Sequence, residues 1–486
     1  MKAPELGVGL VYIPGLEPLF ESRDGSVQVL ELEPQALWRY FPDRPQPYAN
    51  QAALLARLKA LPQHKIVHGV GFPVGGARAP DPRHLSPFCE AIETIGAAWA
   101  SEHLVFNQAK AADGRLRQTG FFLPPLATPA GVEAAANSIR AVADGVPVPF
   151  AVETPANYLK TIPGQMSDGA FTAAVVERAD CGIVLDLHNI WTNEVNGRQS
   201  VEEFLSCIPL ERVLEIHLAG GLKYGNFWLD AHSGDIPQPV LDWAHRLAPC
   251  LPNLGAIIYE VLPAYLPSFG LAGVRRAVEQ MHAIWANRAA PDNAVRRFPA
   301  ASDEILEPPS DLAAADWEDA LAEAILSEEP PATPLGKLLA ADPAVPLIRD
   351  LNRKFRMSAV VANLRMTIRL LLLELPPEEF DSLVLDYCAK FSPQRFGGAE
   401  ARGFADYLQQ LAFDIPFLDE ILRYEVTAME VIADGRPRVV PFSTDPEQLL
   451  DALATGRLPA SPRRGTYEAE IVAPQESSFE NPTTLH

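Results

Sequence analysis

The stretch that decides the fold reads Val213-Leu214-Glu215-Ile216-His217-Leu218-Ala219-Gly220, and Asp230-Ala231-His232 follows ten residues later. An apolar start, alternating residues and a closing glycine pair are typical of a buried strand that ends at Gly220. His217 lies near the carboxyl end of this strand, and imidazole together with carboxylate suits iron, manganese or zinc. The stretch therefore predicts a metal site. The alternative is a buried histidine with a hydrogen-bond partner, beside an unrelated turn aspartate.

Seven more apolar runs of strand length lie in the first 290 residues, and helical patterns separate them. The eight runs are Gly7–Ile13, Val27–Glu33, Lys65–Val70, Ala98–Phe106, Pro149–Thr154, Gly182–Asn189, Val213–Gly220 and Ala256–Leu262. Eight strands alternating with helices over roughly 280 residues are typical of a (β/α)8 TIM barrel, in the α/β class. A doubly wound open sheet is disfavoured, because no strand is followed by a glycine-rich dinucleotide fingerprint.

Polar side chains recur where these strands end, on the face of a TIM barrel that carries catalytic groups. The candidate metal ligands are His68, His103, Glu153, Asp186, Asn189, His217, Asp230, His232 and Glu260. Taken alone, each is more often a strand-end cap or a satisfied polar residue. Together they form a cluster whose burial is costly unless cations are bound. Nine candidates exceed the need of one six-coordinate ion, so we expect two or three metal ions bridged by carboxylates.

The composition restricts the classes of partner. The chain has 40 Lys and Arg against 62 Asp and Glu, a formal charge of −22, which disfavours nucleic acid and anionic membrane as partners. Its five cysteines form no CxxC pair, so neither a disulfide framework nor a thiolate zinc site is indicated. A signal-peptide pattern and a bilayer-length apolar stretch are both missing, so we expect a soluble cytoplasmic protein.

Beyond the barrel the sequence changes character. We expect a barrel domain over residues 1–290, an acidic, proline-rich linker with one helix over 291–344, a mainly helical domain with a small α+β end over 345–474, and a disordered tail over 475–486. Between Asp303 and Glu329 there are ten acidic residues and no basic one. This segment is predicted either as a solvated tether or as a docking element.

The strand-end motifs are His68-Gly69-Val70, Ser101-Glu102-His103-Leu104, Glu153, Leu185-Asp186 with Asn189, Glu215 to Gly220, Asp230-Ala231-His232 and Glu260. Over about residues 5–285 this series resembles the DUF692 family, the multinuclear non-haem iron-dependent oxidative enzymes. The resemblance implies a TIM barrel that holds two or three iron ions in mixed Fe(II)/Fe(III) states, with the nine candidates as ligands. It also implies that O2 is the co-substrate and that residues of a ribosomally made precursor peptide, most often cysteines, are modified.

The chain departs from the family pattern at three places. Thr154 and His188 stand where the family commonly has asparagine, and the segment Glu31-Leu32-Glu33-Pro34-Gln35 replaces an aromatic, asparagine-containing one. We predict that His188 is an added ligand or an acid/base, and that Glu153 and Asp186 are the bridging carboxylates. These three residues are the predicted catalytic set.

The C-terminal helices, ending in Phe417 to Glu425, resemble the family's separate partner protein, which captures the leader of the precursor. We therefore expect the partner module to be fused in cis. Two other functions stay open. One is a divalent-metal TIM-barrel isomerase or phosphodiesterase, in which zinc or manganese would serve and oxygen would play no part. The other is a non-catalytic metal- or peptide-binding protein.

Overall fold

The computed structural model describes residues 3–22, 24–41, 44–111, 113–288, 312–329, 331–411 and 413–473. Eight parallel strands form a closed barrel in the order β1-β14-β11-β10-β9-β6-β5-β2. They are β1 (Gly7–Val11), β2 (Val29–Leu32), β5 (His64–Gly69), β6 (Ala100–His103), β9 (Phe150–Glu153), β10 (Gly182–Asp186), β11 (Val213–Ala219) and β14 (Ala256–Glu260). Each strand overlaps one of the eight predicted runs, and seven lie wholly within them, so the predicted TIM barrel is confirmed.

Helices cover the outside of the barrel, which is why strands such as β10, β11 and β14 are buried along their whole length. These helices are α1 (Glu17–Phe20), α2 (Ala52–Ala60), α3 (Leu85–Ile95), α4 (Pro129–Ala143), α5 (Asp168–Ala179), α6 (Leu187–Val195), α7 (Val201–Cys207), α8 (Gln238–Leu247) and α9 (Leu266–Asn287). Hydroxyl caps start several of them. The Ser200 side chain, for example, forms a capping box with Glu203 at the start of α7.

One predicted strand changes to a helix before its expected end. The run Gly182–Asn189 is strand only to Asp186, and Leu187–Val195 is helix α6. The cause is local, because Asp186 Oδ1 accepts a hydrogen bond from the Asn189 backbone N–H (2.7 Å) and so caps the helix.

Three antiparallel hairpins rise from the carboxyl ends of the strands. They are β3–β4 (Arg39–Tyr40 with Tyr48–Ala49), β7–β8 (Phe106–Lys110 with Leu116–Leu123) and β12–β13 (Leu222–Tyr224 with Phe227–Leu229). They follow β2, β6 and β11 in the chain, so they surround the face of the barrel where functional groups are expected.

The stretch predicted to carry one linker helix carries two in its described part, α10 (Ala314–Leu326) and α11 (Pro334–Ala340). α10 packs on the barrel: Trp317, Leu321 and Ile325 are buried in a cluster that includes Phe106 and Leu123 of the β7–β8 hairpin. Its acidic residues also have partners. Glu318 accepts from the Ala77 N–H (2.5 Å) and pairs with Arg78 (2.6 Å). α10 is therefore a docking element.

The C-terminal region is mainly helical, as predicted, with a small α+β end. Its elements are α12 (Ala344–Asn363), α13 (Arg365–Glu374), α14 (Pro377–Lys390), α15 (Gly397–Leu411), α16 (Leu418–Asp434), β15 (Arg438–Thr444), α17 (Pro446–Ala454) and β16 (Arg464–Ile471). These elements enclose a hydrophobic core of their own, and β15 pairs with β16 in antiparallel fashion. The tail predicted to be disordered lies outside the described residues. Within the described ranges, no helix is both long and apolar enough to cross a membrane.

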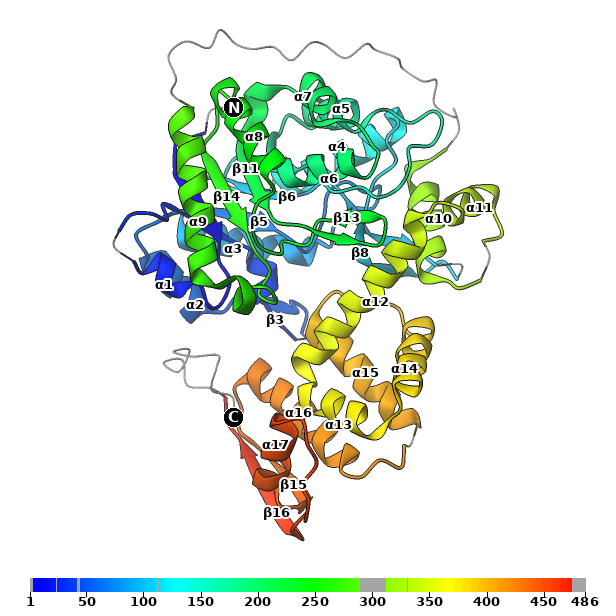
Figure 1. The fold of residues 1–486 in the computed structure, drawn as a ribbon. Helices are drawn as coiled ribbons and strands as arrows, with labels where there is room; N and C mark the ends of the chain where they lie inside the picture. Colours follow the sequence, from blue (N-terminus) through cyan, green and yellow to red (C-terminus); the bar gives the residue numbers. More distant parts are fainter. Residues whose placement is uncertain are drawn as a thin grey trace.

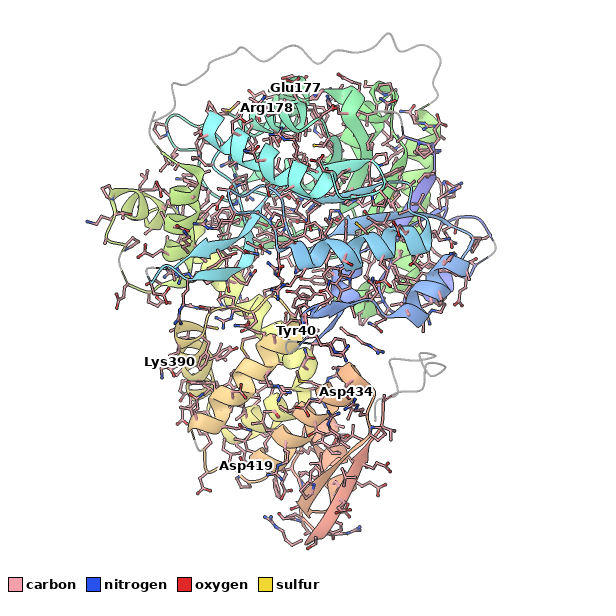
Figure 2. The ribbon with its side chains drawn as sticks, turned by 180° about the vertical axis from the view of Figure 1, so that it is seen from behind. Tyr40, Glu177, Arg178, Lys390, Asp419 and Asp434 are labelled. Carbon is pink, nitrogen blue, oxygen red and sulfur yellow. The ribbon has the colours of Figure 1, made fainter. Side chains whose placement is uncertain are left out.

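The helical region lies against the barrel on the side of the hairpins, where β3, β8 and β13 approach α12 (Figure 1). Figure 2 shows Tyr40 at this junction, and Glu177 and Arg178 at the opposite end of the barrel. Phe396 stacks on Tyr40, with 5.2 Å between ring centroids, and Arg395 contacts His84 Nε2 at 2.5 Å. The helical region thus stands beside the face on which functional groups are expected.

Candidate metal centre

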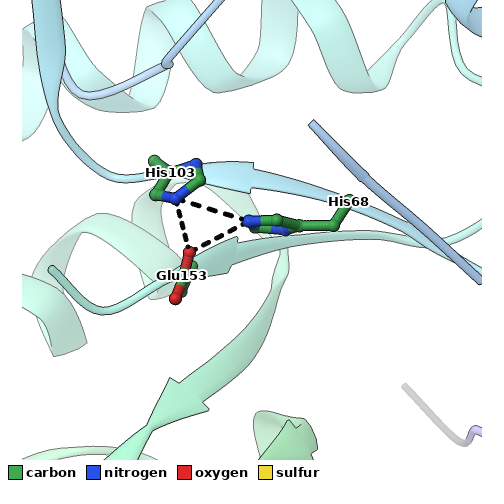
Figure 3. Close-up of side chains that lie close together, drawn as sticks. All are labelled: His68, His103 and Glu153. Atoms are coloured by element: carbon green, nitrogen blue, oxygen red, sulfur yellow. Dashed lines mark hydrogen bonds and ion pairs between the residues drawn. The ribbon is translucent and has the colours of Figure 1, made fainter. Parts of the chain in front are cut away.

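The first group of ligand atoms comes from three neighbouring strands (Figure 3). His68 is the next-to-last residue of β5, His103 ends β6 and Glu153 ends β9. Glu153 Oε2 lies 3.1 Å from His68 Nε2 and 2.9 Å from His103 Nε2, and the two imidazole nitrogens lie 3.4 Å apart. Atoms at these separations can share one cation, so this group can hold a metal ion.

The second group shares Glu153 with the first. Atoms of Glu153, Asp186, His217 and Glu260 all lie within 4.8 Å of one another, and all four side chains are buried. His217 Nδ1 lies 3.4 Å from Glu153 Oε1 and 3.4 Å from Glu260 Oε1. Because the two oxygens of Glu153 face different groups, this carboxylate is placed to bridge two ions.

A third group forms where the loop after β11 returns to β14. His232 Nε2 lies 3.0 Å from Asp230 Oδ1 and 3.5 Å from Glu260 Oε2. Since Glu260 Oε1 faces His217, Glu260 joins the second group to the third. Asn189 is the ninth candidate; its Nδ2 donates to Thr154 O at 3.3 Å.

The glycine pair of the sequence motif is required by this loop. A Cβ at Gly220 would lie 2.5 Å from Gly234 O, and one at Gly221 would lie 2.3 Å from Trp228 Nε1. His232 itself has a φ of 47°, which is uncommon for a residue with a side chain. Its carbonyl accepts a hydrogen bond from the Leu262 N–H (3.1 Å), which ties the loop to the end of β14.

Asp186 differs from the other two carboxylates. Its Oδ1 accepts the N–H that caps α6, and its Oδ2 has no hydrogen-bond partner among the described residues. From the sequence, Glu153 and Asp186 are the predicted bridges, and this stays a prediction. Glu260, whose two oxygens face His217 and His232, is a further carboxylate placed to bridge.

Two buried atoms of these groups, Asp186 Oδ2 and Asn189 Oδ1, have no partner among the described residues. Other buried atoms contact only carboxylate or imidazole groups of the same cluster; they are Glu153 Oε2, His217 Nδ1 and Nε2, His232 Nε2 and Glu260 Oε2. Buried polar groups in folded proteins are nearly always paired, and buried charges are costly unless they are paired or bound to a cation. These atoms therefore fit a centre of several metal ions.

The electrostatics of the cluster agree with this fit. Burial, and then Asp230 and Glu153, raise the pKa of Asp186 well above its usual range. Burial also opposes the charged form of Glu153, but His103 and His68 outweigh it and hold the pKa of Glu153 well below the usual range. The raised pKa means that the charged form of the Asp186 carboxyl is unfavourable in this site. The carboxyl therefore needs either a bound proton or a cation beside it.

Contacts behind the ligands hold the imidazole rings in place. His68 Nδ1 lies 2.8 Å from Ser101 Oγ, and His103 Nδ1 lies 3.0 Å from Gly69 O and 3.2 Å from Glu102 Oε1. Glu102 Oε2 in turn accepts the N–H of Phe72 (3.1 Å). Such partners fix the tautomer and orientation of a metal-binding histidine.

The sequence analysis missed two buried carboxylates, Glu31 and Glu215. His217 Nε2 lies 3.3 Å from Glu31 Oε2 and 3.4 Å from Glu215 Oε1, and Trp99 Nε1 donates to Glu215 Oε2 at 2.9 Å. Burial, followed by Glu215, raises the pKa of Glu31 to about 7. A signal was present, since Glu215 stands two residues before His217 and so faces the same side of the strand.

His188 is fully buried, and both of its ring nitrogens contact protein groups. Nδ1 lies 3.2 Å from Asp230 Oδ1, and Trp228 Nε1 donates to Nε2 at 3.3 Å. The structure thus brings His188 to Asp230. Because each ring nitrogen already has a partner, neither is left free to face the three ligand groups.

Comparisons with known proteins show what the barrel is similar to. A family model described as the RiPP precursor modification enzyme MbnB/TglH/ChrH matches residues 28–260. The chain is 33% identical over 196 residues to a UPF0276 protein of Streptomyces avermitilis, covering 40% of each. It is 32% identical over 182 residues to a UPF0276 protein of Paraburkholderia phytofirmans, covering 36% of this chain and 57% of that one. The chain thus spans about half the length of these curated relatives.

Among solved structures, the chain is similar to a crystal structure of D-psicose 3-epimerase. The identity is 11% and the TM-score 0.37, covering 59% of this chain and 97% of that one. A structural similarity with so low an identity and TM-score does not indicate which reaction this chain catalyses. The family match covers the strands that carry the three ligand groups and contains all nine candidate residues. Over residues 28–260, the barrel of this chain is similar to the MbnB/TglH/ChrH family of RiPP precursor modification enzymes, which supports the assignment to the DUF692 family that its strand-end motifs resemble.

Proposed function

We propose that this protein is an iron-dependent enzyme that uses O2 to oxidise residues, most often cysteines, in a ribosomally made precursor peptide. The observation that carries the proposal is the set of three adjacent ligand groups, joined by Glu153 and Glu260, in a chain similar to this family. A single catalytic ion would need neither shared carboxylate.

The nine residues would hold two or three ions, one at each group that is occupied. His68, His103 and Glu153 form the first group, Glu153, Asp186, His217 and Glu260 the second, and Asp230, His232 and Glu260 the third, with Asn189 as the ninth predicted ligand. When bound, iron in mixed Fe(II)/Fe(III) states supplies redox capacity and open positions for a cysteine thiolate and for O2. The imidazole and carboxylate donors suit iron, and they suit manganese and zinc as well.

The chain's own residues orient the ligands and shape the mouth of the site. With Nε2 of His68 and His103 given to an ion, their Nδ1 atoms face Ser101 and Glu102, so each ring is held from behind. The Phe122 ring lies 4.7 Å from the His103 ring and covers it on the side of the β7–β8 hairpin. An apolar wall beside the ligands limits the access of water to the reacting cysteine.

The helical region is proposed to hold the leader of the precursor. Its α12 contacts the hairpins at the mouth: the side chain of Asn352 donates to Thr119 O of β8, and Tyr224 OH of β12 donates to Asp350 (2.6 Å). A peptide bound there would be tethered near the ions, which raises its effective concentration without new contacts at the site. A cytoplasmic location and the absence of a nucleic-acid partner stay predictions of the sequence.

The test uses the full chain loaded with iron under nitrogen. The substrate probe is a synthetic peptide translated from a short, Cys-containing reading frame beside the gene, and the control peptide has Ser in place of each Cys. We expect O2 consumption and a mass change with the Cys peptide, and neither with the Ser peptide. Equal turnover of both peptides would contradict the proposal that the substrate cysteine binds as a thiolate. Turnover of a sugar or phosphodiester by the zinc- or manganese-loaded chain, with no need for O2, would instead support the isomerase or phosphodiesterase.

A further inference from the structure

The side chain of His188 lies between Trp228 and Asp230 at the start of α6. It is fully buried, and it comes two residues after Asp186, the cap of that helix. The ring contacts Trp228 Nε1 through Nε2 (3.3 Å) and Asp230 Oδ1 through Nδ1 (3.2 Å). Its surroundings therefore decide which nitrogen carries the proton.

The indole fixes the tautomer of the imidazole. Trp228 Nε1–H can only donate, so His188 Nε2 must accept and carries no proton. The neutral ring then has its proton on Nδ1, where it donates to Asp230 Oδ1. Both nitrogens are used in this way, so no lone pair is left for a metal ion. An acid/base role would also require the ring to give up one of its two contacts.

The pair of rings is built into the fold. Asn196, at the end of α6, accepts the Trp228 backbone N–H through Oδ1 and donates to the Trp228 carbonyl through Nδ2, both at 2.9 Å. The same helix thus carries His188 and holds the strand of Trp228. A Cβ at Gly221 would lie 2.3 Å from Trp228 Nε1 and 2.6 Å from His188 Nε2, so the glycine leaves room for the contact.

Asp230 is held from two directions. Its backbone N–H donates to Tyr158 OH at 3.0 Å, and its Oδ1 contacts His188 Nδ1 and His232 Nε2. The main chain of Asp230 is fixed by Tyr158. Rotation of its carboxylate is restrained by His188.

We propose that His188 is a positioning residue. In the single tautomer that Trp228 sets, the His188 ring holds the Asp230 carboxylate in place for the third ion. The inference rests on the proposed function only in taking Asp230 as a metal ligand. Partners of this kind typically contribute about 10- to 100-fold to metal affinity. It replaces the two roles that the sequence left open, an added ligand or an acid/base.

The test compares His188→Asn, Trp228→Phe and the control Trp317→Phe. Trp317 is a control because it is buried and its indole donates to Pro124 O (3.0 Å), and not to a residue of the three ligand groups. The metal-free full chain is titrated anaerobically with Fe(II), and the dissociation constants of successive equivalents are measured without peptide or O2. We expect His188→Asn to weaken one equivalent about 10- to 100-fold. Trp228→Phe should weaken the same equivalent by about 2- to 10-fold, as for one neutral hydrogen bond, and Trp317→Phe should not change it.

A second readout needs no metal. In metal-free protein with ¹⁵N-labelled histidine, NMR should show His188 with its proton on Nδ1, because Asp230 can only accept and Trp228 Nε1–H can only donate. If His188 were a ligand, Trp228→Phe would free Nε2 and leave affinity unchanged or higher, which would overturn the proposal. Unchanged affinity in both His188→Asn and Trp228→Phe would overturn it too. A chain that binds its ions as described but oxidises no peptide would refute the proposed function and leave this inference standing.

Discussion

A buried cluster of charged side chains in the helical region and another in the barrel differ in whether the chain itself provides a hydrogen-bond partner for each of their polar atoms. In the helical region, Arg356 and Glu400 are both buried and pair at 2.7 Å. Glu400 Oε1 also accepts from Tyr387 OH (2.9 Å), its Oε2 accepts from the Gln394 N–H (2.6 Å), and Arg356 donates to two backbone carbonyls. Every oxygen of this carboxylate has a partner within the chain.

In the barrel, carboxylates and imidazoles face one another, and several of their atoms have no hydrogen-bond partner in the described part of the chain. A cluster that the protein completes by itself contributes to structure. A cluster that it leaves incomplete at the carboxyl ends of barrel strands is built to bind something else, and for these donors the fitting partner is a set of cations.

The largest effect should come from Glu153→Gln. The substitution keeps the size of the side chain but removes the charge shared by His68, His103 and His217. We expect the loss of the first and second ions and a fall in turnover beyond the about 100-fold that loss of an outer partner costs. Elemental analysis after anaerobic loading measures this. Glu400→Gln is the matched control and should keep the full metal content; a full complement of ions in Glu153→Gln would mean that the cluster is not the metal site.

Glu400→Gln should have the next largest effect, on stability. Breaking a buried ion pair leaves Arg356 uncompensated, which typically costs about 3–5 kcal/mol. Urea unfolding followed by circular dichroism should show the helical region, which contains no tryptophan, unfolding at lower urea than in the wild type, with ion binding unchanged. A loss below about 1 kcal/mol would show that the pair is not the structural element described here.

Acidification should weaken the contact between the two regions. Burial, and then Arg395, lower the pKa of His84 to about 3; Asp81 opposes this and Arg83 adds to it. The unfolded chain takes up this proton near pH 6.5, but the folded chain does so only near pH 3. The stabilisation is therefore complete above pH 6.5 and is lost as the pH falls, by about 2 kcal/mol at pH 5. Urea unfolding at pH 7.5 and pH 5 measures it. His84→Gln should lose less stability than wild type over this interval, and equal losses would contradict the assignment.

Glu215→Gln should have the smallest effect, and with opposite signs in two assays. Removing this charge relieves its repulsion of Glu31, so the metal-free protein should become more stable by about 1 kcal/mol. The same change weakens the carboxylate support of His217 Nε2, so the second ion should bind about 10-fold more weakly. Thermal unfolding of the metal-free protein and anaerobic Fe(II) titration measure the two effects. If the metal-free Glu215→Gln protein were less stable than the wild type, Glu215 would stabilise the fold without metal, as Glu400 does in the helical region, and the account would be contradicted.

The barrel and the positions of its candidate ligands could be predicted because both depend on local pattern. Strand length, the spacing of apolar runs and a polar residue at each carboxyl end are visible in single segments. Contacts that join distant segments were not visible. Glu318 contacts Ala77 and Arg78, which lie some 240 residues earlier in the chain. The acidic charge of the segment alone could therefore not separate a tether from a docking element.

The same reason explains what could not be foreseen inside the site. The capping of α6 by Asp186 was not predicted, because the apolar pattern had concealed that helix. The environment of His188 depends on Trp228, 40 residues later in the chain. Glu31 was seen only as a departure from the family pattern, because its partner His217 is on a strand far along the chain.

The central claim is that the incomplete cluster in the barrel holds iron. Its most direct test is elemental analysis and Mössbauer spectroscopy of iron-57-enriched protein purified under nitrogen. The account predicts two or three irons per chain with a coupled, mixed-valent signal, which is reduced to isolated iron or lost in Glu153→Gln. Stoichiometric zinc or manganese with negligible iron, or no bound metal at all, would contradict it.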